Sequence, residues 1–144
     1  MEKMNIEFGN PKKRFGYITV DLNPIDKGVI QSDAVEYLKN TQLNFDIIES
    51  YNLLEHLKNP YEFLELCYKH LNINGKLITV TDNAEWLPFY LPFIHSLGFG
   101  AHESNLYKYK LFSKDAKITK HYYIFAPLHL KNLLEDIGFR NITI

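Results

Sequence analysis

The chain has 144 residues, of which 46% are hydrophobic and 23% are charged, and its formal net charge is -1. This composition is typical of a folded domain, and a chain so close to neutral lacks the positive field that recruits nucleic acids or acidic membranes. The single cysteine, Cys67, excludes an internal disulfide and a cysteine-based zinc cluster, and without a membrane-length apolar run or a secretory signal we expect a cytoplasmic protein.

Short apolar runs alternate with longer helix-like segments, an order typical of a parallel sheet covered by helices. Runs rich in β-branched and aromatic residues predict seven strands, at residues 4–8, 17–20, 29–31, 45–50, 76–81, 122–125 and 141–144. The only local basic run, Lys12-Lys13-Arg14, falls between the first two strands and is interpreted as a solvated loop. A short helix is expected over residues 33–40.

Two further helices have end signals in the sequence. At the first, Asn59 is an N-cap followed by a proline, and an apolar stripe continues through Leu71 until Gly75 ends the segment. At the second, apolar residues recur at i, i+3, i+4 and i+7 over residues 130–137, and Gly138 provides the stop. Each helix therefore has one apolar face.

Residues 86–112 interrupt this alternation with eight aromatic side chains in twenty-seven positions. Pro88 and Pro92 prevent a long helix there. We interpret the region, about residues 84–120, as an insertion in a single domain of residues 1–144. Such an insertion would cover a ligand site or contact a second subunit in a homo-oligomer, and packing onto the same domain is the alternative.

Acids and a glycine lie at or just after the ends of the first three predicted strands, at the edge where open α/β sheets bind ligands. Glu7 lies late in the first strand and Gly9 would bring a ligand close to the backbone, although the segment also fits an ordinary Gly-Asn-Pro turn. Asp21 suits the two hydroxyls of a ribose, or a turn. Asp33 suits the exocyclic amine of an adenine, or an N-cap. Together these residues indicate a nucleoside-binding edge.

Several stretches of the chain resemble the sequences of one known protein family and together cover most of the chain. They are residues 5–9, 16–24, 45–57, 71–78 and 126–139. The most specific is Leu54-Glu55-His56-Leu57 with the Phe-Asp strand before it. On these stretches the chain resembles class I S-adenosylmethionine-dependent methyltransferases of the compact, type 11-like kind. The resemblance implies a Rossmann-like α/β fold, with a mostly parallel sheet, flanking helices, a shortened first βαβ unit and an antiparallel last strand.

The resemblance also implies a site for S-adenosylmethionine. The cofactor-binding residues that it implies are Glu7, Gly9 and Asn10 beside the methionine part, Asp21 at the ribose, Leu22, Asp33 and Ala34 at the adenine, and Ser50 and Tyr51 at the methyl-transfer end. His56 would be a general base for the methyl acceptor, a role that suits histidine side chains in general, or would only order the loop around it. No metal site is expected, because the six histidines include no i, i+4 pair.

The leading hypothesis for function is methyl transfer to a small molecule, a sugar or a protein side chain. A rival is an inactive relative kept as a binding or assembly module, because Asn10-Pro11 stands where the family turn has a second glycine. A weaker rival is another nucleoside-binding enzyme, such as a reductase, which would need a richer glycine turn. Gly9 and Asp21 are twelve positions apart, too few for a full crossover helix between the first two strands.

Overall fold

The structure, a computed structural model, describes residues 3–85 and 122–144. The predicted insertion at about 84–120 lies almost wholly outside the described residues, so its role as a cover or a subunit contact stays a prediction, as does the division into one domain. The described elements are β1 (Asn5–Phe8), β2 (Ile18–Asp21), β3 (Ile30–Gln31), α1 (Ala34–Asn40), β4 (Phe45–Tyr51), η1 (Leu54–His56), α2 (Pro60–His70), β5 (Leu71–Val80) and α5 (Pro127–Ile137). No helix in these two stretches has the length and apolar character to cross a membrane.

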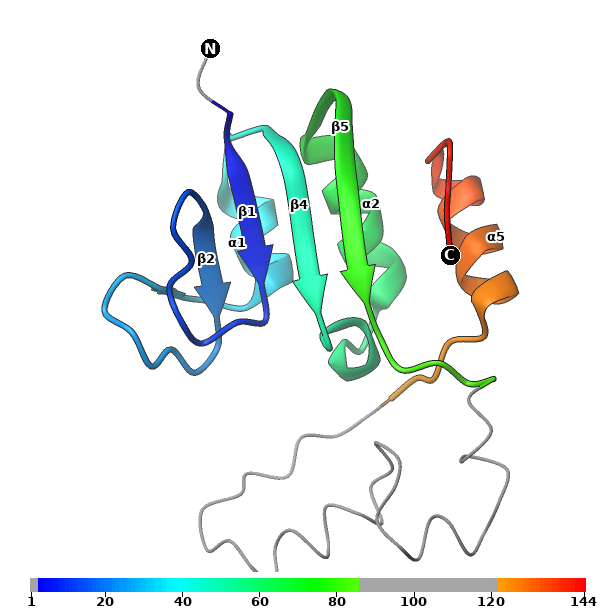
Figure 1. Cartoon of the computed structure of the whole chain (residues 1–144), viewed down its shortest axis with the longest axis horizontal. Helices are drawn as coiled ribbons and strands as arrows, with labels where there is room; N and C mark the ends of the chain where they lie inside the picture. The colour runs from blue at the N-terminus through cyan, green and yellow to red at the C-terminus, as the bar shows by residue number, and fades with distance from the viewer. Residues whose placement is uncertain (1–2, 86–121) are drawn as a thin grey trace, which may run out of the picture.

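The five strands form one sheet in the order β3-β2-β1-β4-β5, and every neighbouring pair is parallel. Figure 1 shows α1 and α2 behind this sheet and α5 beyond the β5 edge. The strand order reverses between β1 and β4, because the chain first moves outward from β1 to β3 and then returns to the other side of β1. Ligands of open α/β sheets bind beyond the carboxyl ends of the strands at such a reversal.

Side chains of β1 alternate between the two faces of the sheet. Phe8 is fully buried and packs edge-on against Tyr37 of α1 and Phe63 of α2, with ring centroids 6.1 and 5.6 Å away. Glu7, the preceding residue, therefore points to the opposite face. The helical face of the sheet holds the apolar core, and the other face leaves room for polar side chains at the carboxyl end of β1.

The connection from β1 to β2 consists of the nine residues 9–17, and none of them is helical. Parallel neighbours usually need a crossover of about a dozen or more residues. Here both strands have four residues, so a short loop suffices to return to the start of β2. The loop is held by the N–H of Ile25, which donates to the carbonyl oxygen of Pro11 over 2.8 Å. The shortened first unit is confirmed.

The strands predicted at 122–125 and 141–144 do not form. The N–H of Tyr122 donates to the carbonyl oxygen of Glu55 over 2.7 Å, and Phe125 makes only an isolated parallel bridge to Asn83. The antiparallel last strand is not found among the described residues, whose sheet is parallel throughout. Residues with high β propensity form a strand only where a neighbouring strand completes their hydrogen bonds, and the described part of the chain offers these two segments none.

The helix that was expected to continue toward Gly75 ends at His70. Leu71 instead begins β5 and pairs with Phe45, while Lys76 pairs with Ile47. The residues between these two pairs form an irregularity in the strand. The prediction that the apolar stripe of the helix includes Leu71 was wrong, because the pairing of Leu71 with Phe45 of β4 overrides the local pattern.

Candidate functional site

The carboxyl ends of β1 and β4 approach each other closely at Gly9. Gly9 follows β1 with a φ of +82°, and its N–H donates to the carbonyl oxygen of Val20 over 3.2 Å. A Cβ added at Gly9 would lie 2.9 Å from the carbonyl oxygen of Tyr51, the last residue of β4. Both the left-handed backbone and the close approach therefore require glycine.

Two buried acids lie side by side next to this point. Glu7 and Glu49 are register partners on β1 and β4, and they are 3% and 4% exposed. Nη1 of Arg14 lies 3.6 Å from Oε1 of Glu7 and forms a hydrogen-bonded ion pair with Glu49. The hydroxyls of Tyr17 and Tyr51 donate to Glu49 over 2.8 and 2.9 Å. We call these five residues the acid–arginine cluster.

The hydrogen bonds within the cluster decide its charge. Burial acts to raise the pKa of Glu49, but the hydrogen bonds from Tyr17, Arg14 and Tyr51 outweigh burial and hold that pKa below its usual value. The hydrogen bond to Glu49 in turn raises the pKa of Arg14. At neutral pH the cluster therefore presents an ionised carboxylate and a guanidinium in direct contact.

A cavity of about 550 Å³ lies beside the cluster and is lined by Glu7, Gly9, Asn10, Arg14, Tyr51 and Asn52. Four of the six were predicted from the sequence, and the structure brings them together. Arg14 and Asn52 were missed, and the interpretation of Arg14 as part of a solvated loop was wrong. A signal for Arg14 was present, because Glu49 lies within an apolar strand and a buried acid needs a counter-charge.

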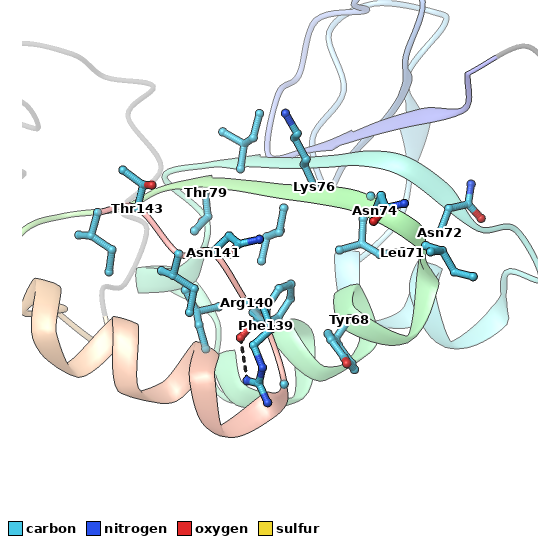
Figure 2. A pocket seen from close by; sticks show the side chains of 18 of the residues that line it. Tyr68, Leu71, Asn72, Asn74, Lys76, Thr79, Phe139, Arg140, Asn141 and Thr143 are labelled. Atoms are coloured by element: carbon cyan, nitrogen blue, oxygen red, sulfur yellow. Dashed lines mark hydrogen bonds between the residues drawn. The ribbon is translucent and has the colours of Figure 1, made fainter.

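A second cavity, of about 1010 Å³, lies between β5 and the C-terminal segment 138–144. Figure 2 shows Thr79 of β5 and Asn141 of the C-terminal segment on its two sides. None of its described lining residues is an acid or a histidine, and Lys76 and Arg140 are its charged side chains. The smaller cavity is the better candidate site, because it combines charged groups of both signs with the switch point of the sheet.

Comparison with known proteins now adds to this geometry. The family model described as "Methyltransferase domain" matches residues 6–144. The chain belongs to this methyltransferase domain family. The resemblance found in the sequence is confirmed by this match.

A solved structure, that of a putative methyltransferase from Bacillus halodurans, is similar to this methyltransferase domain with a TM-score of 0.59 and 17% identity. The match covers 96% of this chain and 63% of the other, so this chain spans less than two thirds of that protein. At such an identity the likeness shows the fold alone. No curated protein matches the sequence.

The predicted adenosine contacts of the methyltransferase domain lie farther along the same sheet edge. Asp21 ends β2, and its carboxylate accepts a hydrogen bond from the N–H of Asn23 over 2.7 Å, as in the turn interpretation. Leu22 beside it is 57% exposed. Asp33 caps α1 by accepting from the N–H groups of the helix, and Ala34 is buried in the first turn. These contacts neither require nor prevent a nucleoside, so the ligand roles stay predictions.

The structure separates the residues that were predicted for the methyl-transfer end. Tyr51 lines the cavity, whereas Ser50 is fully buried and shares a hydrogen bond of 2.8 Å with the hydroxyl of Thr79. His56 ends η1 and does not line the cavity. The neighbouring Glu55 is 1% exposed, and its carboxylate accepts a hydrogen bond of 2.7 Å from Thr81. The hydrogen bond of Glu55 therefore ties the loop that contains His56 to the residue that follows β5.

Proposed function

We propose that the protein is an enzyme that binds S-adenosylmethionine and transfers its methyl group to a small molecule, a sugar or a protein side chain. The observation that supports this best is the cavity at Gly9, at the carboxyl ends of β1 and β4 in a chain of the methyltransferase domain family. When bound, the cofactor supplies a methyl group that a nucleophile can take by in-line displacement. The cytoplasmic location expected from the sequence belongs to the same proposal.

The residues at the sheet edge fit the parts of this cofactor. Glu7 and Arg14 provide charges of both signs for a zwitterionic amino-acid group, and Gly9 lets the carboxyl ends of β1 and β4 approach closely beside the cavity. Asp21 lies one strand away and offers carboxylate oxygens to ribose hydroxyls. In this arrangement the protein binds and orients the reactants, and most of the rate comes from that positioning.

The ribose role of Asp21 can be tested by calorimetric titration with S-adenosylmethionine and with its demethylated product. Asp21→Ala should weaken the binding of both ligands by roughly 1.5–3 kcal/mol, the usual worth of hydrogen bonds to a charged group. Asp21→Asn keeps an acceptor for the N–H of Asn23 and tests whether the turn alone explains a loss. Asp136→Ala, an exposed change on α5, is the control and should have no effect. Unchanged affinity of a folded Asp21→Ala variant would exclude this role.

The proposed base can be tested once an acceptor gives turnover. His56→Gln should lower kcat by roughly 10²- to 10⁴-fold, since a general base typically contributes this much. The affinity for the demethylated product should stay the same, because His56 does not line the cavity. An equal kcat in the variant would leave His56 with only the role of ordering its loop.

The second candidate function is a binding module without activity. It is favoured by the β1–β2 loop, in which no residue is helical and Pro11 has no N–H to donate to a ligand. Cofactor titration and an assay for the demethylated product distinguish the two candidates. A module would bind the cofactor weakly or not at all and would release no demethylated product with any acceptor.

A further inference from the structure

The β1–β2 loop lacks the usual anion-binding feature of an α/β unit. A helix that follows the first strand presents free N–H groups and a positive dipole end, and both attract an anionic ligand group. In this chain residues 9–17 form no helix, and Pro11 removes one further donor. A ligand with a carboxylate would therefore find few backbone donors here.

The same loop carries a cation into the cavity. Arg14 lines the cavity, and its guanidinium carbon lies 3.9 Å from the centre of the Tyr17 ring. Its Nη1 is held by Glu7 and Glu49, whereas the side chain as a whole is 39% exposed. The guanidinium is thus fixed on its protein side by an aromatic ring and two carboxylates. Its fork of five N–H donors suits a second, planar anion on the open side.

The other cations of the loop do not share this position. Lys13 donates from Nζ to the carbonyl oxygen of Tyr17 over 2.5 Å, and Lys12 is exposed. Neither of these two lysines lines the cavity. Among the described residues, Arg14 is the cation that lines the cavity at the carboxyl end of β1.

We propose that Arg14 binds the carboxylate of the amino-acid part of the ligand and replaces the missing helix N-terminus in that role. The inference rests on the proposed function and names the residue that sets ligand specificity at this end of the site. Glu7, 3.6 Å from the guanidinium, receives the ammonium group of the same amino acid. Asn10 orients Glu7 by donating to Oε2 over 3.3 Å. The two opposite charges in contact match those of an α-amino acid.

A pair of ligands isolates this contact. S-adenosylhomocysteine carries the amino acid, and 5′-methylthioadenosine has the same nucleoside and thioether without it. Calorimetric titration of wild type and Arg14→Gln with both ligands measures the difference. We expect Arg14→Gln to lose roughly 10- to 100-fold in affinity for S-adenosylhomocysteine, as for a charge-assisted hydrogen bond. Its affinity for 5′-methylthioadenosine should be unchanged.

Matched variants separate a ligand contact from a structural role. Lys12→Gln removes a charge from the same loop and should bind both ligands like wild type. Arg14→Lys keeps the charge but not the fork, so it should lose less affinity for S-adenosylhomocysteine than Arg14→Gln. If Arg14→Gln does not fold, the double variant Arg14→Gln/Glu49→Gln also removes the acid that the first change leaves unpaired. The titrations with the two ligands are then made with Glu49→Gln as the reference and with the double variant.

Three results would overturn the role of Arg14. Unchanged affinity of Arg14→Gln for S-adenosylhomocysteine would mean that Arg14 does not bind the ligand. Equal losses for both ligands would mean that Arg14 only supports the cluster, and tighter binding by Arg14→Gln would mean that Arg14 blocks the cavity. If wild type binds neither ligand, the proposed function itself is wrong and the inference falls with it.

Discussion

Gly9→Ala should lower the free energy of unfolding by roughly 2–4 kcal/mol and abolish the binding of S-adenosylmethionine, the proposed cofactor. The backbone of Gly9 has a φ of +82°, in the left-handed region that is unfavourable for alanine wherever it occurs. In addition, the new Cβ would lie 2.9 Å from the carbonyl oxygen of Tyr51, a backbone atom that cannot rotate away. Relief of this contact must move the carboxyl ends of β1 and β4 apart, and these ends line the cavity.

Gly16→Ala is the matched control for this prediction. Gly16 has a similar φ of +77°, but no heavy atom beyond its own residue and its two chain neighbours lies within 4 Å of its added Cβ. It should therefore show only the backbone cost, roughly 1–2 kcal/mol, and keep its affinity for the cofactor. Denaturant unfolding of both variants and titration with S-adenosylmethionine measure the difference. Equal stabilities of the two variants would contradict the close approach of β1 and β4.

Glu49→Leu should destabilise the protein at neutral pH by roughly 2–4 kcal/mol, because removal of this buried carboxylate leaves its hydrogen-bond and ion-pair partners unsatisfied. Arg14 loses its closest carboxylate, and the hydroxyls of Tyr17 and Tyr51 both lose their acceptor. Arg14 is partly exposed, so water limits the cost. Glu36→Gln, an exposed change on α1, should have almost no effect in the same unfolding experiment.

The effect of Glu49 should also depend on pH. Its pKa in the folded protein is lowered, so its contribution to stability is complete above its ordinary pKa, about 4.3. The contribution is lost as the pH falls further, through the lowered pKa of the folded state. The difference in unfolding free energy between wild type and Glu49→Gln should therefore stay the same from neutral pH down to about pH 4 and shrink below that pH. A difference that stays constant with pH would mean that the pKa of Glu49 is the same in the folded and the unfolded protein.

Local signals in the sequence determined the ends of several elements. Asn59 accepts a hydrogen bond from the N–H of Glu62 at the start of α2, and Gly138 ends α5 with a φ of +122°. Asp33 caps α1 as one of its two interpretations expected. Each of these contacts joins residues a few positions apart, so residue type and spacing suffice to predict it. The sequence likewise predicted a parallel sheet, with Glu7 and Gly9 at the carboxyl end of its first strand.

Only the tertiary structure decided the partners of these residues. Arg14 and Glu49 are thirty-five positions apart, and their ion pair exists because β1 and β4 are neighbours while the β1–β2 loop folds over them. The strands expected at 122–125 and 141–144 failed for a related reason. Strand formation needs hydrogen bonds to a neighbour that no short window of sequence contains. The charge of the candidate site therefore depends on the packing of distant segments, whereas its position depends on the local pattern of strand ends.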